Sequence, residues 1–241
     1  MPTTIDNDTE LSAVNSILGS IGQSPVNNLN FNNPEIEFIY SILTEVNKDV
    51  QNEGWQFNLE EDQVLTMKGA DLTAGGVAGS SNTGIEGVTV DETADDSNIA
   101  YIKLADTVLS IAIRKGSTSK TVEKTQIRST TALGRHLYDL ANNIETWDCT
   151  DNVTYTLDVS TLYAFANVPN VFQRYITYRS AVRAATQLIA NPQLVQLLQL
   201  QEVTARANCL EYEGKQGDHS FFGLPNAKRL HSQLLNRASG S

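Results

Sequence analysis

Few residues of this chain have the type and spacing that catalysis or metal binding requires. The histidines, His136, His219 and His231, stand apart, and none has a histidine or cysteine partner at ligand spacing. Cys149 and Cys209 are the only cysteines, which are too few for a disulfide scaffold and are not spaced as a metal pair. We therefore expect no metal, no cofactor and two reduced thiols, with Cys209 packed within a helical pattern.

Three local patterns resemble catalytic or phosphate-binding motifs but lack their defining features. The adjacent acids Glu60-Glu61-Asp62 point in different directions, which suits a solvated turn better than a hydrolytic pair or a cation site. The glycines of the run 75–84 are not followed by Gly-Lys-Ser/Thr or by a helix start, as a phosphate-binding loop requires. Gly79-Ser80-Ser81 is not a nucleophile elbow. The sequence therefore predicts that the protein is not an enzyme.

The length and the charge of the chain exclude further classes of protein. The 241 residues suffice for one large domain or two small ones. No apolar run approaches the roughly 20 residues that a membrane span needs, and the polar start 1–10 lacks the features of a signal peptide. The net charge of −11 argues against a protein that reads nucleic-acid sequence, which would need a basic face. We expect a protein that is used without secretion and does not bind a membrane.

Two amphipathic helices are predicted near the N-terminus. The first spans 11–21, with a cap at Asp8 or Thr9 and an end at Gly22. The second opens at Asn33-Pro34-Glu35, where a cap, a first-turn proline and an acid stand in the preferred order, and it runs to Gly54. Its expected buried stripe steps at helical spacing through Ile36, Ile39, Leu43, Val46 and Val50.

Strand periodicity follows in the centre of the chain. Trp55, Phe57 and Leu59 alternate with polar residues, which indicates a strand. The Gly-rich run 75–84 within 68–98 is expected to be an exposed loop or an arm ordered only by partners. Asn142-Asn143 is expected to form a hairpin turn. Short strand patterns, which together suggest a small antiparallel sandwich or barrel, recur at 99–104, 108–113, 125–128, 135–140 and 153–159.

Helical spacing returns in the last third. One stripe runs from Val171 to Ile189, and Asn191-Pro192 restarts the chain as a cap and first turn. The expected buried stripe of this last helix is Leu194, Leu197, Leu198, Gln201 and Ala205, with Leu210 nearer its end.

The order of these elements predicts an α+β fold. A helical bundle formed by the N- and C-terminal helices would carry an inserted antiparallel β domain and an extended C-terminal arm, because no helix can bury its apolar face alone. The corresponding boundaries are 1–58 and 161–217 for the two halves of the bundle, 59–160 for the β domain and 218–241 for the arm.

The C-terminal arm is the candidate binding site. Residues 166–241 hold eight bases and four acids, which suits either an ordinary solvated face or an arm that docks on an acidic surface of a neighbouring copy or another protein. Its apolar residues stand beyond the last helix, so they either dock on a partner or pack back onto the chain. The candidate partner-binding residues are Phe221, Phe222, Leu224, Lys228 and Arg229.

Several short motifs match a known family in their order along the chain. They are Leu11-Ser12-Ala13-Val14-Asn15 with Pro25-Val26, Gly54-Trp55-Gln56-Phe57-Asn58, Leu137-Tyr138-Asp139 with Asn142-Asn143, Arg174-Tyr175-Ile176 and Glu211-Tyr212-Glu213. Together they resemble tail tubular protein A, the adaptor or head-to-tail connector of short-tailed bacteriophages, including its "GW-x-FN" motif. The centre, 68–128, is poorly covered by this resemblance.

The resemblance implies a structural virion protein without catalytic residues. Such adaptors form a ring of twelve copies between the portal and the tail nozzle, tail tubular protein B, as part of the DNA ejection channel. The helical bundle would meet the portal, and the β domain would face the nozzle and tail fibres. Genomic DNA would pass through non-specifically, and an acidic lumen would let it slide. The ring would be assembled in the host cytoplasm and reside in the virion tail.

Two other functions remain open from the sequence. The β insertion could be a tail-associated binding module that recognises a host surface or a carbohydrate, although it shows few aromatic residues beyond Tyr101, Tyr138 and Trp147. The second function is that of a wall-degrading hydrolase carried in a tail. The lack of a convincing acid/base pair argues against this function.

Overall fold

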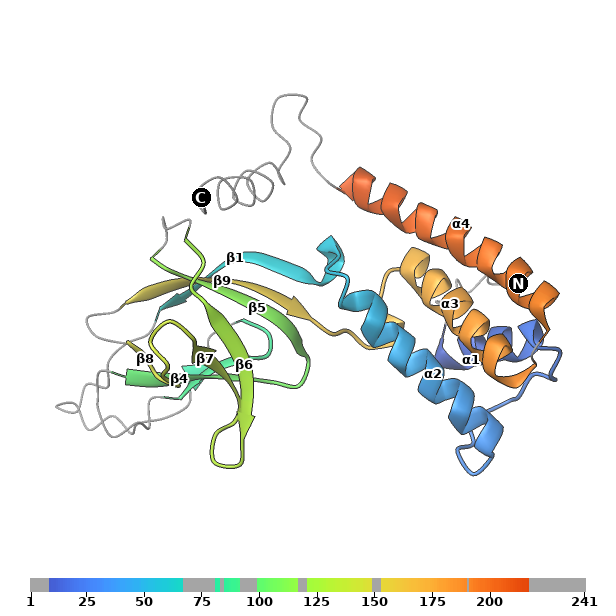
Figure 1. Cartoon of the computed structure of the whole chain (residues 1–241), viewed down its shortest axis with the longest axis horizontal. Coiled ribbons are helices and arrows are strands. Elements are labelled where there is room, and N and C mark those ends of the chain that lie inside the picture. The colour runs from blue at the N-terminus through green and yellow to red at the C-terminus, as the bar shows by residue number, and fades with distance from the viewer. Residues whose placement is uncertain are drawn as a thin grey trace, which may run out of the picture. The chain divides into compact units, whose positions relative to one another are not determined.

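Along the chain, helices come before and after a β region in the computed structural model, as the colours of Figure 1 show. The structure describes residues 9–66, 81–82, 85–91, 99–116, 121–148, 153–189 and 191–216. The chain divides into a helical unit, 1–57 with 163–241, and a β unit, 58–162. The predicted α+β class is confirmed.

Among the described residues, four α-helices build the helical unit, and the first two begin at local capping signals. They are α1 (Glu10–Ser20), α2 (Pro34–Gln51), α3 (Asn170–Leu188) and α4 (Pro192–Gln216). The Thr9 hydroxyl accepts a hydrogen bond from the Ser12 amide at 3.2 Å, and the Asn33 side chain accepts one from the Glu35 amide at 3.0 Å. Each of these side chains satisfies a helix amide that has no partner within its own helix, so the caps predicted at Thr9 and Asn33 are confirmed.

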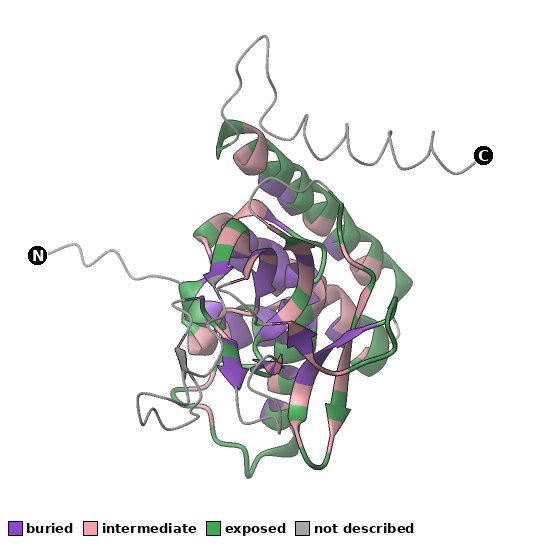
Figure 2. Ribbon diagram, turned by 90° about the vertical axis from the view of Figure 1, so that its left-hand side faces the viewer, coloured by how far each residue is buried: buried purple, intermediate pink, exposed green. Residues whose placement is uncertain are grey.

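Helix α3 is the centre of this unit, since it packs against α1, α2 and α4 (Figure 1). Phe172, Tyr175 and Ile176 of α3 are almost completely buried. The predicted stripe of α2 is confirmed, because Ile36, Ile39, Leu43, Val46 and Val50 are all buried. Buried residues of all four helices form the core of the unit, whereas α4 is the long helix that is mostly exposed in Figure 2.

The described strands of the β unit form two antiparallel sheets. The first has the order β1-β9-β5, formed by Leu59–Thr66, Thr154–Thr161 and Val108–Lys115. The second has the order β2-β3-β4-β7-β6, formed by Ser81–Asn82, Val88–Asp91, Ile99–Leu104, Gly134–Asp139 and Thr125–Thr130, and β8 (Trp147–Asp148) pairs with β4. One apolar core includes residues of both sheets, among them Leu157 of β9 and Ile102 of β4. This arrangement is a small sandwich, one of the two predicted forms.

An ion-pair cluster holds the edge of the first sheet. Asp62 has a positive φ of 56° at an irregularity in β1, and its amide donates a hydrogen bond to Asp158 of β9 at 2.9 Å. Arg114 of β5 lies 2.8 Å from a carboxylate oxygen of both Asp62 and Asp158. The turn predicted for Glu60-Glu61-Asp62 is therefore wrong, because these acids lie in a bulged edge strand, which resists pairing with another strand edge. Glu61 and Asp62 are exposed to solvent, as predicted.

The other local predictions have mixed outcomes. The strand expected at Trp55 and Phe57 is wrong, because the short 3-10 helix η1 (Gln56–Asn58) precedes β1. The turn at Asn142-Asn143 is confirmed, with a φ of 56° at Asn143. Most of the Gly-rich run and the whole arm 218–241 lie outside the described residues. Within the described part of the chain, no helix is long and apolar enough to cross a bilayer.

Candidate assembly surface

The histidine and cysteine that the structure describes, His136 and Cys209, are buried and packed within the protein. No group of three His, Cys, Asp or Glu side chains among the described residues is placed to hold a metal ion. His136 is fully buried, and its Nδ1 lies 3.0 Å from the carbonyl oxygen of Gly134. Cys209 is buried as predicted, and burial, followed by the charge of Glu53, raises the pKa of its thiol to about 12. This thiol therefore remains protonated and unreactive near neutral pH.

The predicted partner-binding residues Phe221, Phe222, Leu224, Lys228 and Arg229 lie outside the described residues. The structure instead shows a surface that the sequence analysis missed, on the outward side of α4. Leu200 and Val203 are each 67% exposed, and Leu210 is 56% exposed. With Ala207, they share one side of the helix at a spacing of three or four residues. We call Leu200, Val203, Ala207 and Leu210 the α4 ridge.

Helix α4 thus carries apolar residues on two opposite sides. Leu198, Ala205 and Cys209 form its buried side, within the core of the helical unit. The predicted stripe is only partly right, because Leu197, Gln201 and Leu210 are exposed. Helical spacing alone could not separate the two sides, since the residues of each side recur at helical spacing.

The α4 ridge also lacks charge. The segment 192–210 contains only two charged residues, Glu202 and Arg206. Gln196 and Gln199 adjoin the ridge, and the hydroxyl of Thr204 donates to the Leu200 carbonyl at 2.9 Å, so its hydrogen-bond donor is used within the helix. Surfaces that stay in water normally mix many charges of both signs, whereas the centres of protein interfaces are depleted in charge. The ridge has the composition of an interface.

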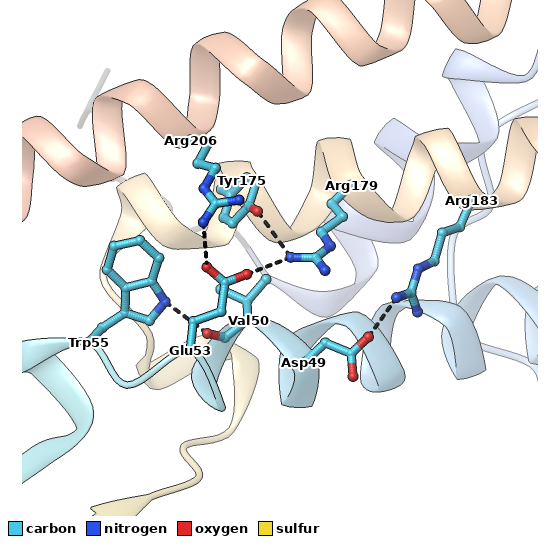
Figure 3. A network of polar contacts seen from close by, with 8 residues as sticks. All are labelled: Asp49, Val50, Glu53, Trp55, Tyr175, Arg179, Arg183 and Arg206. Atoms are coloured by element: carbon cyan, nitrogen blue, oxygen red, sulfur yellow. Dashed lines mark hydrogen bonds and ion pairs between the residues drawn. The ribbon is translucent and has the colours of Figure 1, made fainter. Parts of the chain in front are cut away.

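An ion-pair network fixes α4 to the rest of the unit (Figure 3). Glu53, just beyond α2, accepts hydrogen bonds from Arg179 of α3 at 2.7 Å and Arg206 of α4 at 3.2 Å. Arg179 also donates to the Tyr175 hydroxyl at 3.0 Å. Burial and then the charge of Glu53 raise the pKa of Tyr175, which therefore stays neutral. The Glu53 carboxylate thus links α3, α4 and the end of α2, and these contacts hold α4, which carries the ridge, against the rest of the unit.

The motif Gly54-Trp55-Gln56-Phe57-Asn58 follows α2 directly and lies beside this network. Gly54 has a φ of +78°, a conformation that side chains disfavour. The Trp55 indole donates to the Val50 carbonyl at 2.8 Å, and the Phe57 ring packs on Phe172 with centroids 4.6 Å apart. The Gln56 amide donates to Glu213 of α4 at 2.6 Å. The motif therefore has a packing role and joins the end of α2 to α3 and α4.

A family model described as tail tubular protein matches residues 11–83 and 92–219. The chain belongs to the tail tubular protein family. This assignment confirms the resemblance seen in the motifs and makes the chain a structural protein of the phage tail. No curated protein sequence matches the chain.

The part of the chain that matches the family model includes the α4 ridge. The matched residues include all of α2, α3 and α4 and all but the first residue of α1, so this tail tubular protein carries its ridge within the part that the family shares. The five predicted partner-binding residues, from Phe221 to Arg229, follow the end of the match at residue 219 and lie outside that shared part.

Replacing Glu53 tests the network that positions α4. We expect Glu53→Gln to lower the free energy of unfolding by about 1 kcal/mol, because the side chains are a quarter to a half exposed and solvent weakens their attraction. Urea denaturation measures this change. Glu45→Gln is the control, since Glu45 is 69% exposed and 3.5 Å from Arg183, and it should have almost no effect. Equal effects of the two variants would contradict the role given to Glu53.

Proposed function

We propose that the protein is the tail adaptor of a short-tailed bacteriophage. Copies of it form a ring of twelve, which joins the portal to the tail nozzle and lines part of the DNA ejection channel. The α4 ridge is the observation that carries this proposal, because it is a fixed, uncharged apolar surface that a multi-copy assembly would bury. The motifs shared with tail tubular protein A favour an adaptor over a nozzle subunit.

The net charge of −11 agrees with a passage for DNA. Basic side chains along a channel would bind phosphates and release counterions, which slows the movement of the duplex. An acidic lumen repels the duplex and leaves it free to slide. The family membership supports a location in the virion tail, and assembly would take place in the host cytoplasm before the tail is complete.

Electron microscopy of intact particles tests the proposal directly. The expected result is a ring of this chain at the junction between capsid and tail, with the helical unit toward the portal and the β unit toward the nozzle and fibres. Density for the chain in the nozzle, or its absence from that junction, would overturn the adaptor assignment.

The C-terminal arm supplies a second contact of this adaptor. We expect deletion of residues 221–241 to weaken binding to the portal ring about tenfold, since Phe221, Phe222 and Leu224 are apolar anchors beside two bases. The thermal unfolding temperature should stay within a few degrees of that of the full chain. Binding is measured by co-sedimentation with purified portal rings. A truncated chain that fails to fold would show that the arm belongs to the core.

A further inference from the structure

The α4 ridge needs a partner surface of matching length and charge. From Leu200 to Leu210 the ridge extends about 15 Å along the helix axis. A partner helix of about three turns would cover it. Because the ridge carries no charge, a charged partner surface would lose its hydration without gaining an ion pair.

Two surfaces of the helical unit are unsuited to this role. The exposed side of α2 carries Glu37, Glu45 and Lys48, so it is charged. A second α4 ridge would match in character, but a contact between identical surfaces closes at two copies and cannot continue into a ring. The interface must therefore join the ridge to a different face.

The outward face of α1, formed by Ser12, Ser16 and Gly19, has the required properties. All three residues are exposed and small, and a Cβ added at Gly19 would meet nothing within 4 Å. The Ser12 hydroxyl donates to the Thr9 carbonyl at 2.9 Å. The only charged residue of α1 is Glu10, whose carboxylate accepts a hydrogen bond from Tyr40 at 3.1 Å. This face is flat and uncharged.

Length and placement agree with a contact between α1 and α4. Helix α1 has 11 residues, or about 16 Å, which matches the length of the ridge. Both helices pack on α3, which lies between them in Figure 1, and each turns its buried side toward the common core. Their exposed sides therefore belong to different faces of the unit, as a head-to-tail contact requires.

We propose that the α4 ridge of one copy packs on the outward α1 face of the next copy, with large side chains of the ridge seated over Ser12, Ser16 and Gly19. This contact rests on the proposed function, since it assumes a ring of copies. It makes α1 and α4 the two complementary sides of each subunit interface.

Cysteine cross-linking in assembled particles tests the contact. The chain carries Ser16→Cys and Leu200→Cys in a Cys149→Ser background, and the buried Cys209 stays in place because its thiol is protonated. A short bismaleimide should give a ladder of dimers, trimers and larger species. The matched control replaces Ser16→Cys with Thr44→Cys on the exposed side of α2, and it should give no ladder.

The other outcomes each have a definite meaning. If Leu200→Cys alone gives dimers, the ridge meets a second ridge and the proposal is wrong. If Leu200→Cys in the free chain is shielded from maleimide until residues 221–241 are deleted, the chain's own arm covers the ridge and the proposal is also wrong. Particles that contain the chain but give no ladder overturn the contact alone, whereas particles that lack the chain overturn the adaptor function.

Charge substitutions give a second, independent measurement. Ser16→Glu and Leu200→Glu change exposed positions, so both chains should fold, and each should lower incorporation into particles at least about tenfold. Thr44→Glu is the control and should be incorporated like the unchanged chain. Normal incorporation of either test variant would overturn the contact.

Discussion

Phe172→Ala is expected to lower the free energy of unfolding of the helical unit by about 4 kcal/mol, since removal of a fully buried phenylalanine leaves a cavity. Phe172 of α3 lies where the segment that follows α2 meets α4. Its ring centroid is 4.8 Å from that of Trp55, 4.6 Å from that of Phe57 and 6.0 Å from that of Tyr212. The substitution therefore removes the ring contacts that join α3 to Tyr212 of α4 and to the segment that follows α2.

The two tryptophans allow the units to be followed separately. Trp55 lies in the core of the helical unit and Trp147 in that of the β unit. In a Trp147→Phe background, tryptophan fluorescence during urea denaturation reports the helical unit. Phe31→Ala is the matched control, because Phe31 is 49% exposed, and it should cost less than about 1 kcal/mol. A loss as small as the control's would show that the cluster is not the centre of the unit.

Local sequence signals predict much of the helical unit. Thr9 and Asn33 cap their helices because a short polar side chain reaches a free amide within the first turn, and this interaction depends on neighbouring residues alone. The stripe of α2 is also predictable, since its exposed side is polar and leaves one possible buried side. Where one side of an element is clearly polar, periodicity decides which side is buried.

The same reasoning fails where both sides are apolar. Helical spacing assigns Leu197 to the buried side of α4 and leaves Leu200 unassigned, although both are more than half exposed. The choice is made by α3, which covers Leu198, Ala205 and Cys209 and is itself positioned by α1 and α2. The short 3-10 helix at Gln56–Asn58 escapes prediction for a similar reason, because the contacts of Phe57 with Phe172 override the alternating pattern.

The candidate surface has a signal in its composition. An uncharged run from Pro192 to Gln201 is unusual on a helix that faces water on one side, so the sequence points to the start of the ridge at Leu200. It gives no such signal for Val203, Ala207 and Leu210, because Glu202 and Arg206 stand among them. The network at Glu53 has no such signal. Its partners Arg179 and Arg206 follow it by 126 and 153 residues, and only the folded chain brings these side chains together.

A buried glutamine fixes the point where the chain re-enters the helical unit. Gln51 is fully buried in the last turn of α2. Its side-chain oxygen accepts a hydrogen bond from the Tyr163 amide at 2.8 Å, and its nitrogen donates to the Tyr163 carbonyl at 2.8 Å and to Asn47 at 2.9 Å. A single amide side chain thus pairs with both backbone groups of Tyr163, as a neighbouring strand would.

Gln51→Leu is expected to lower the free energy of unfolding of the helical unit by about 2 kcal/mol, since the partly buried Tyr163 amide loses its acceptor, whereas the Tyr163 carbonyl keeps the hydrogen bond that Asn47 donates at 3.2 Å. Urea denaturation followed by Trp55 fluorescence measures the change, with Gln187→Leu as the control at an exposed position of α3.

The variant Gln51→Glu keeps the size of the side chain and its hydrogen-bond acceptor but loses the amide donor. Its buried carboxyl can donate to the Tyr163 carbonyl only when protonated, so its folded-state pKa should be raised and this variant should lose stability as the pH rises. A loss for Gln51→Leu no larger than that of Gln187→Leu, or a Gln51→Glu chain as stable at about pH 8 as at about pH 5, would show that Tyr163 is held by other contacts.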